Sequence, residues 1–191
     1  MRARFYFLFP LLIISCCEGV SQHIEFYKED LKFSIDNECF KVRGTYFFRN
    51  LTSDTVSKFL IYPFPDEKVY GKIDSVRVIN RDDVTETNKL KGINTRGAYF
   101  AIKILPNGIG DYEISYRQHI YEGKMKYILT SMNAWHNNLE EADFELTYPA
   151  NVCIDSINFL PDQLEIINDM VVWKWKKKDF MPQKDIEIYL R

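Results

Sequence analysis

Hydrophobic and polar residues alternate with a period of two along most of the chain from Ile24 onward. The segment 40–48 shows this best, because its aromatic and aliphatic residues alternate with lysine, arginine and threonine, as in a strand with one buried face. The same alternation recurs in the segments 98–104, 112–117, 144–148, 171–176 and 186–190, and weaker strands are predicted at 31–35, 57–62, 73–79, 126–131 and 152–159. Helical periodicity hardly occurs, and a helical turn is predicted only within 133–142.

Residues that favour tight turns lie between these predicted strands. Pro106-Asn107-Gly108 and Pro161-Asp162 are examples. About ten short strands without the intervening helices of a βαβ protein predict an all-β fold, an antiparallel β-sandwich. Neither a repeat nor a Ser/Gly linker divides 24–191, so this segment is expected to be a single domain.

The segment 1–15 has the pattern of a signal peptide. Arg2 and Arg4 precede an apolar run, 5–14, which at about ten residues is too short to span a bilayer. The run ends at Ile-Ile-Ser-Cys, which resembles the lipobox of bacterial lipoproteins. We therefore expect export, lipidation of Cys16, and a tether, 16–23, that holds the domain at a membrane of the cell envelope, facing the periplasm or the cell surface. An ordinary cleaved signal with incidental cysteines is the alternative.

The numbers of basic and acidic residues indicate which binding partners are expected. The chain has 25 Lys and Arg against 27 Asp and Glu, a formal net charge of −2. This balance lacks the basic excess of a nucleic-acid-binding protein, so no nucleic acid partner is expected. The predicted partners are the membrane, through the lipid anchor, and an envelope protein or a glycan.

Several strings in the predicted strands and turns form a recognisable set. They are EDLKFSI at 29–35, VRGTYFFRN at 42–50, YPFPD at 62–66 and YILTS at 127–131, followed by Trp135. Together they resemble a family of exported bacterial proteins known only as a domain of unknown function. The resemblance implies a β-rich, sandwich-like domain, similar in style to the N-terminal domain of vault and inter-alpha-trypsin-inhibitor proteins. It implies no catalytic residues, and the shared positions would be core and turn residues.

His136 is the histidine best placed for chemistry, because Glu140 and Glu141 follow it closely. A histidine beside carboxylates is able to act as a general base or to bind a metal ion. The sequence contains no H-E-x-x-H, no C-x-x-C and no second histidine at ligand spacing. We therefore predict no metal, no cofactor and no catalytic residue. The alternative is an envelope hydrolase that acts on glycan or peptidoglycan near His136.

Aromatic side chains are abundant, with 14 Phe, 12 Tyr and 3 Trp. Trp173 and Trp175 share one face of a predicted strand, and with Trp135 and His136 they are the candidate ligand-binding residues, able to stack on sugar rings or on apolar groups of a partner. A sandwich core also needs bulky inward residues. The core interpretation of Trp173 and Trp175 is favoured because Val171 shares their face.

Cys39 and Cys153 are the two cysteines of the predicted globular part. In an oxidising envelope they are candidates for a disulfide, and the sequence leaves open whether they pair. Taken with the other patterns, the chain is predicted to be a non-catalytic binding or scaffolding module. Its functional residues are expected in the loops 80–94 and 133–142, because a sandwich presents its loops at its ends.

Overall fold

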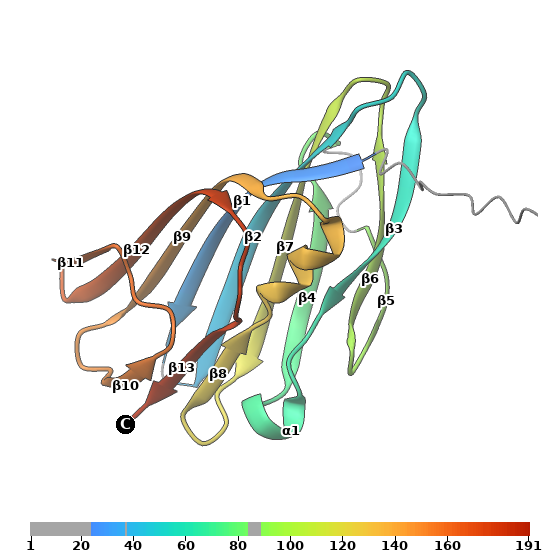
Figure 1. Cartoon of the computed structure of the whole chain (residues 1–191). Coiled ribbons are helices and arrows are strands. Elements are labelled where there is room, and N and C mark those ends of the chain that lie inside the picture. Colours follow the sequence, from blue (N-terminus) through green and yellow to red (C-terminus); the bar gives the residue numbers. More distant parts are fainter. Residues whose placement is uncertain (1–23, 37, 84–88) are drawn as a thin grey trace, which may run out of the picture.

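The computed structural model of the protein describes residues 24–36, 38–83 and 89–191, which form thirteen β-strands and two short helices (Figure 1). The predicted all-β fold is confirmed. The predicted signal peptide and Cys16 lie outside the described residues. Within those residues, no helix has the length and apolar character needed to cross a membrane.

The strands follow one another with short connections. They are β1 (Ile24–Ile35), β2 (Cys39–Asn50), β3 (Val56–Pro63), β4 (Ile73–Asn80), β5 (Leu90–Asn94), β6 (Gly97–Ile104), β7 (Ile109–His119), β8 (Lys124–Tyr127), β9 (Leu139–Pro149), β10 (Ile154–Ile157), β11 (Gln163–Ile167), β12 (Met170–Phe180) and β13 (Ile186–Leu190). The helices are α1 (Glu67–Tyr70) and the 3₁₀ helix η1 (Thr130–Trp135).

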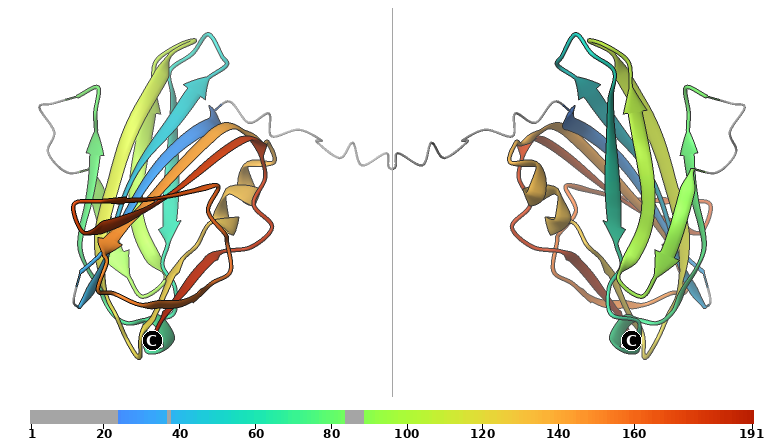
Figure 2. Two further views of the ribbon diagram at one scale, coloured as in Figure 1. Left: turned by 90° about the vertical axis from the view of Figure 1, so that its left-hand side faces the viewer. Right: turned by 90° about the vertical axis from the view of Figure 1, so that its right-hand side faces the viewer.

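Three sheets build the domain. A seven-stranded sheet has the order β11-β12-β9-β1-β2-β7-β4, and two three-stranded sheets have the orders β10-β13-β8 and β3-β6-β5. Figures 1 and 2 show the large sheet as a curved wall, with the β10-β13-β8 sheet and η1 against one side of it. Buried side chains of all three sheets form one hydrophobic core, so the sheets pack on one another as in a sandwich.

The pairing of β1 with β9 departs from the predicted antiparallel arrangement. These two strands are parallel, whereas the other pairs of named strands in the described part of the chain are antiparallel. β9 reaches the free edge of β1 only after the chain has formed β2 to β8 and η1, and it then runs in the same direction as β1. Parallel neighbours need such a long crossover connection.

Two strands and one helix were not predicted. β5 and β11 have no buried residue, so their sequences lack the alternation that marks a strand with one buried face. α1 is a second helical turn beyond the one predicted, and Asp66 caps it by accepting a hydrogen bond from the Lys68 amide. The helical turn predicted within 133–142 is found only in part, because η1 spans Thr130–Trp135 and β9 begins at Leu139. The strand predicted over 126–131 ends at Tyr127.

A β-bulge changes the inward-facing residues of β1. The register between β1 and β2 shifts between Phe26 and Lys28. Ile24 and Phe26 are buried before the bulge, and Glu29 and Leu31 are buried after it. Because successive strand residues point to opposite faces, the extra residue turns Glu29 inward in a strand that would otherwise place it on the outer face.

Candidate functional site: a cavity around a buried carboxyl group

A cavity of about 90 Å³ lies on the inner side of the large sheet, against the segment that connects β8 to η1. Its wall is mainly aromatic and aliphatic, with Phe26, Phe48, Phe100 and Trp135 among the rings that line it. About 10–15 Å³ of such space accommodates one water molecule, so the cavity is large enough for several waters or for one small organic molecule.

Glu29 is the acidic residue that lines this cavity. Its side chain is 2% exposed, and its Oε1 atom has no hydrogen-bond partner among the described residues. Its cross-strand neighbours are Tyr46 of β2 and Ala142 of β9. An unpaired buried polar atom costs about 1–3 kcal/mol relative to a satisfied one, so this carboxyl oxygen is an unused binding group.

Three tyrosine hydroxyls meet in the same cavity. The hydroxyl of Tyr46 donates to that of Tyr62 over 2.9 Å and shares a hydrogen bond with that of Tyr127 over 3.0 Å. These residues come from β2, β3 and β8, so the cluster joins three strands that are distant in the sequence. Gly44 provides the space, since a Cβ atom there would collide with the hydroxyl oxygen of Tyr46.

Burial controls the charge of these groups. Loss of hydration raises the pKa of Glu29 to about 8, and the negative charge of Asp30 adds to this rise. Burial likewise raises the pKa values of Tyr46, Tyr62 and Tyr127 well above 10. Near neutral pH the cavity therefore holds a protonated carboxyl group and three neutral phenols.

Trp135 closes one side of the cavity. Its ring centroid lies 5.8 Å from that of Phe26 and 5.4 Å from that of Phe48, and the ammonium of Lys58 lies 4.0 Å from the Trp135 ring centroid. Ile61 of β3 and Ser131 of η1 are both exposed and also line the cavity, which therefore reaches solvent between β3 and η1. Trp135 is thus one predicted ligand-binding residue that the structure places at a cavity.

Comparison with solved structures shows the same fold in a protein of known structure. A proposed nutrient-binding protein of Legionella pneumophila superposes with a TM-score of 0.66 and 15% sequence identity, over 88% of this chain and 67% of that one. The two chains share an all-β fold. An M1 zinc metallopeptidase of Deinococcus radiodurans gives a TM-score of 0.48 and 8% identity over 88% of this chain and 42% of that one, which does not establish a common fold. No family model matches the chain, and no curated protein matches it.

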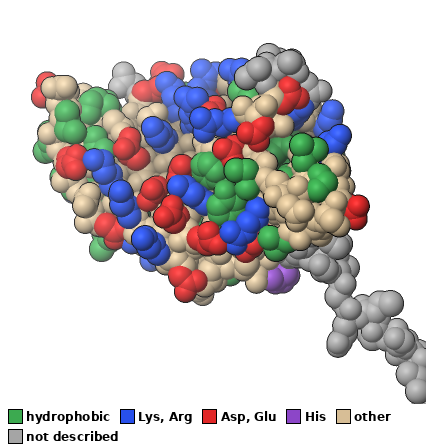
Figure 3. All heavy atoms as spheres, turned by 90° about the horizontal axis from the view of Figure 1, so that it is seen from above, with side chains coloured by type: hydrophobic (Ala, Val, Ile, Leu, Met, Phe, Trp, Pro, Cys, Tyr) green, Lys and Arg blue, Asp and Glu red, His purple; other side chains and the backbone are tan. Residues whose placement is uncertain are grey.

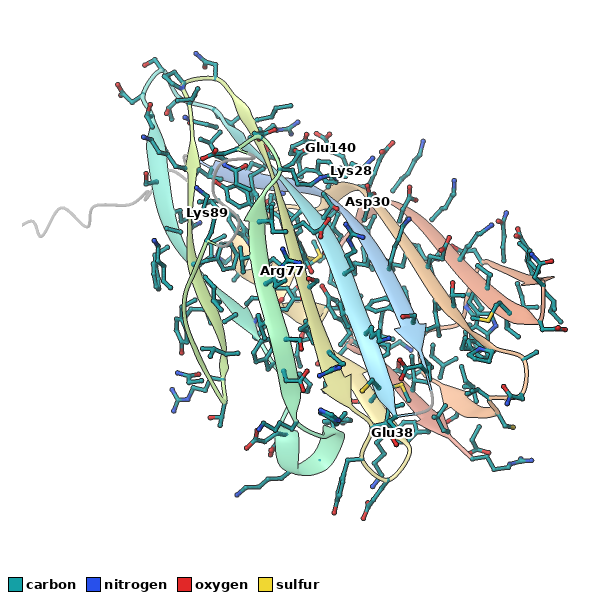
Figure 4. All side chains as sticks on the ribbon, turned by 180° about the vertical axis from the view of Figure 1, so that it is seen from behind. Lys28, Asp30, Glu38, Arg77, Lys89 and Glu140 are labelled. Carbon is teal, nitrogen blue, oxygen red and sulfur yellow. The ribbon has the colours of Figure 1, made fainter. Side chains whose placement is uncertain are left out.

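In the described part of the chain, no hydrogen bond or ion pair joins His136 to Glu140 or Glu141. His136 is exposed and ends η1 with a left-handed backbone, φ 56°. Glu140 binds Arg49 over 2.6 Å and Glu141 binds Lys28 over 3.1 Å. Figure 4 shows Lys28 and Glu140 close to one end of the outer face of the large sheet. Both carboxylates are therefore engaged by cations.

Trp173 and Trp175 belong to the core. Trp175 is 1% exposed, and its indole NH donates to the backbone oxygens of Phe159 and Leu160. Trp173 packs against the same core, with its ring centroid 6.3 Å from that of Trp175. This corrects the candidate ligand-binding role of Trp175, because a ring that is covered by protein offers no face to a ligand.

The two cysteines are free thiols, which corrects the considered disulfide. Cys39 is buried at the start of β2, with its Sγ atom 3.9 Å from Nδ1 of His119 on β7. Cys153 is exposed, and its backbone oxygen accepts from the Arg191 amide beside the β10-β13-β8 sheet. The thiols therefore have different neighbours on different sheets.

Cys39, His119 and Asp74 form a chain of a thiol, an imidazole and a carboxylate, each within reach of the next. Nε2 of His119 lies 2.9 Å from a carboxylate oxygen of Asp74, which Arg117 also binds. A nucleophilic cysteine needs a thiolate. Here burial raises the pKa of Cys39, and the residue is only 7% exposed. The arrangement does not favour nucleophilic catalysis.

Glu29 and the tyrosine cluster were missed by the sequence interpretation. In β1, hydrophobic residues occupy even positions at Ile24 and Phe26 and odd positions at Leu31, Phe33 and Ile35. That change of parity indicates a bulge and would have placed Glu29 on the inner face. Of the predicted functional loop 80–94, the segment 84–88 lies outside the described residues, and Leu90–Asn94 forms β5.

Proposed function

We propose that this protein binds a small molecule in the cavity around Glu29. The observation that carries the proposal is the Oε1 atom of Glu29, which lines the cavity and has no partner among the described residues. A ligand that donates a hydrogen bond to this oxygen would remove the penalty of the unpaired group, and the aromatic wall would supply apolar contact.

The geometry favours binding over catalysis. Glu29, the three phenols and Ser131 are polar groups in a wall that is mostly apolar, which is the usual composition of a pocket that orients a ligand. Figure 3, seen from above, shows side chains of both charge signs intermingled with small hydrophobic patches on that face. The fold likeness to a proposed nutrient-binding protein is compatible with this function class.

The test is a ligand-observed NMR screen in which small polar compounds are added to the full mature chain. Ser131 is exposed and lines the cavity, so Ser131→Trp would obstruct its opening without changing the core. Ser57 is exposed on β3 and does not line the cavity, which makes Ser57→Trp the matched control. We expect compounds that bind the wild type and Ser57→Trp but not Ser131→Trp. Binding that is equal in all three proteins would refute the assignment.

We also propose that the protein is exported and anchored in the cell envelope by lipid on Cys16. The support is the apolar segment that ends at Ile13-Ile14-Ser15-Cys16. The acyl chains of a lipoprotein hold a domain firmly at a membrane, whereas a single chain does so only marginally. Cys16→Ser should move the protein from the membrane fraction to the soluble fraction. A wild type that is itself soluble and begins beyond residue 16 would contradict the proposal.

A further inference from the structure

The described lining of the cavity contains an acidic side chain and no basic one. Among the described side chains that line it, Glu29 is the one acidic group, and none is a lysine, an arginine or a histidine. Seven of the lining residues are aromatic: Phe26, Tyr46, Phe48, Tyr62, Phe100, Tyr127 and Trp135. Aromatic faces carry a negative quadrupole that attracts cations. The lining therefore complements a positive charge better than a negative one.

We propose that the ligand of this cavity is a small organic ammonium ion, whose charged nitrogen pairs with the Glu29 carboxylate among the aromatic rings. This inference rests on the proposed function and names the ligand class. The cavity of about 90 Å³ is smaller than the roughly 150 Å³ cavity that holds benzene in another protein, so the ligand has about six non-hydrogen atoms or fewer.

Lys58 already places an ammonium group against one of the aromatic rings of the cavity. Its ammonium lies 4.0 Å from the ring centroid of Trp135, and no ion pair joins it to a carboxylate in the described part of the chain. Burial lowers the pKa of Lys58, so part of its hydration is lost at this position. The aromatic ring thus accepts an ammonium group at the edge of the cavity, which supports the same contact for a ligand inside it.

Binding of an ammonium ion requires a proton to leave Glu29. The protonated carboxyl group of Glu29 loses its proton to solvent, and the resulting carboxylate pairs with the ligand, which keeps its own proton. Because burial raises the pKa of Glu29 to about 8, affinity should rise about tenfold per pH unit below that value and level off above it.

The groups that face Glu29 do not supply a competing titration in this range. Tyr46, Tyr62 and Tyr127 come from three strands and have pKa values well above 10, and Ala142 of β9 is apolar. Asp30 is the neighbouring acid on β1, and its charge contributes to the raised pKa of Glu29. Lys58 is a cation at the Trp135 edge of the cavity, with its ammonium 4.0 Å from the Trp135 ring centroid.

Isothermal titration calorimetry with propylammonium chloride at pH 5.5, 6.5 and 7.5 tests the inference, with 1-propanol as the neutral probe of the same size. We expect propylammonium to bind at least tenfold tighter than 1-propanol at pH 7.5, and its affinity to rise about tenfold per pH unit. Titrations at pH 6.5 in buffers of different ionisation enthalpy should report release of about one proton per ligand.

Glu29→Gln is the decisive variant, and Glu38→Gln, at an exposed residue between β1 and β2, is its control. Propylammonium should lose at least tenfold in affinity in Glu29→Gln and none in Glu38→Gln, while 1-propanol binding is unchanged. Equal binding of both probes to the wild type, or propylammonium affinity without pH dependence, would overturn the inference and leave the binding function standing. Failure of both probes, together with a negative compound screen, would overturn the binding function as well. The pH profile of the wild type decides the matter even if Glu29→Gln does not fold.

Discussion

Replacement of Glu29 by glutamine should stabilise the protein near neutral pH. Glutamine has almost the same shape as the protonated carboxyl group, but it cannot ionise. In the wild type, burial raises the pKa of Glu29 from its ordinary value of 4.5 to about 8. Below pH 4.5 the folded and unfolded states both bind the proton, so this group imposes no loss of stability there.

Between pH 4.5 and pH 8 the unfolded chain releases that proton and the folded protein keeps it. The wild type should therefore lose about 1.4 kcal/mol of unfolding free energy per pH unit through Glu29 alone. From the two pKa values, the loss reaches about 3 kcal/mol at pH 7 and about 5 kcal/mol above pH 8. Glu29→Gln lacks this loss, so its advantage over the wild type should grow with pH and then level off.

Urea unfolding followed by tryptophan fluorescence at pH 5, 6, 7 and 8 measures this difference. Other titrating groups contribute equally to both proteins and cancel in the comparison, and Glu38→Gln should follow the wild type at every pH. Parallel pH profiles of the wild type and Glu29→Gln would refute the reasoning, because they would mean that Glu29 is hydrated or paired in the folded protein. Replacement of a ligand-binding side chain often raises the stability of a protein while it lowers its function.

Three further predictions concern residues outside the cavity. Trp175→Ala should lower the free energy of unfolding by about 3–5 kcal/mol in urea titrations, because it empties a fully covered core position. Asn50→Ala should lower it by about 2–3 kcal/mol, measured in the same way, because the Asn50 amide bonds to the backbone oxygens of Asp54, Ile104 and Leu105 in its part of the core. In a thiol-labelling assay, Cys153 should react in the native protein and Cys39 only after unfolding, and rapid labelling of Cys39 in the native protein would contradict its burial. Because both thiols are free, a reductant should leave the melting temperature unchanged.

The sequence predicts the long strands well because their burial is one-sided. β2 and β9 lie in the middle of the large sheet and bury alternate residues, so period-two alternation is visible in their sequences. β11 lies at the edge of that sheet, and Leu164 and Ile166 in it are exposed hydrophobic residues. The sequence of such a segment shows no alternation that would predict a strand. It pairs with its neighbour through backbone hydrogen bonds, which do not require a buried face.

The cavity is harder to predict because its polar groups converge from separate strands. Trp135 was a candidate ligand-binding residue, and the structure places it at the cavity. Tyr46 was expected in the core, but its bonds to Tyr62 and Tyr127 depend on how three sheets pack. Glu29 would ordinarily be assigned to a solvated face, and only the bulge in β1 reverses that assignment.

The parallel pairing of β1 with β9 determines the order in which the fold can form. Lys28 and Glu141, which face each other across this pair, are separated by 113 positions in the chain. Until β9 is available, one side of β1 is an unpaired edge next to strongly hydrophobic residues, and such edges template association between chains. Contacts between distant segments also slow folding, to milliseconds or seconds for domains dominated by them. A nascent chain that lacks β9 would therefore have a central strand open to aggregation, and it would need to be kept unfolded or protected until residues 139–149 emerge.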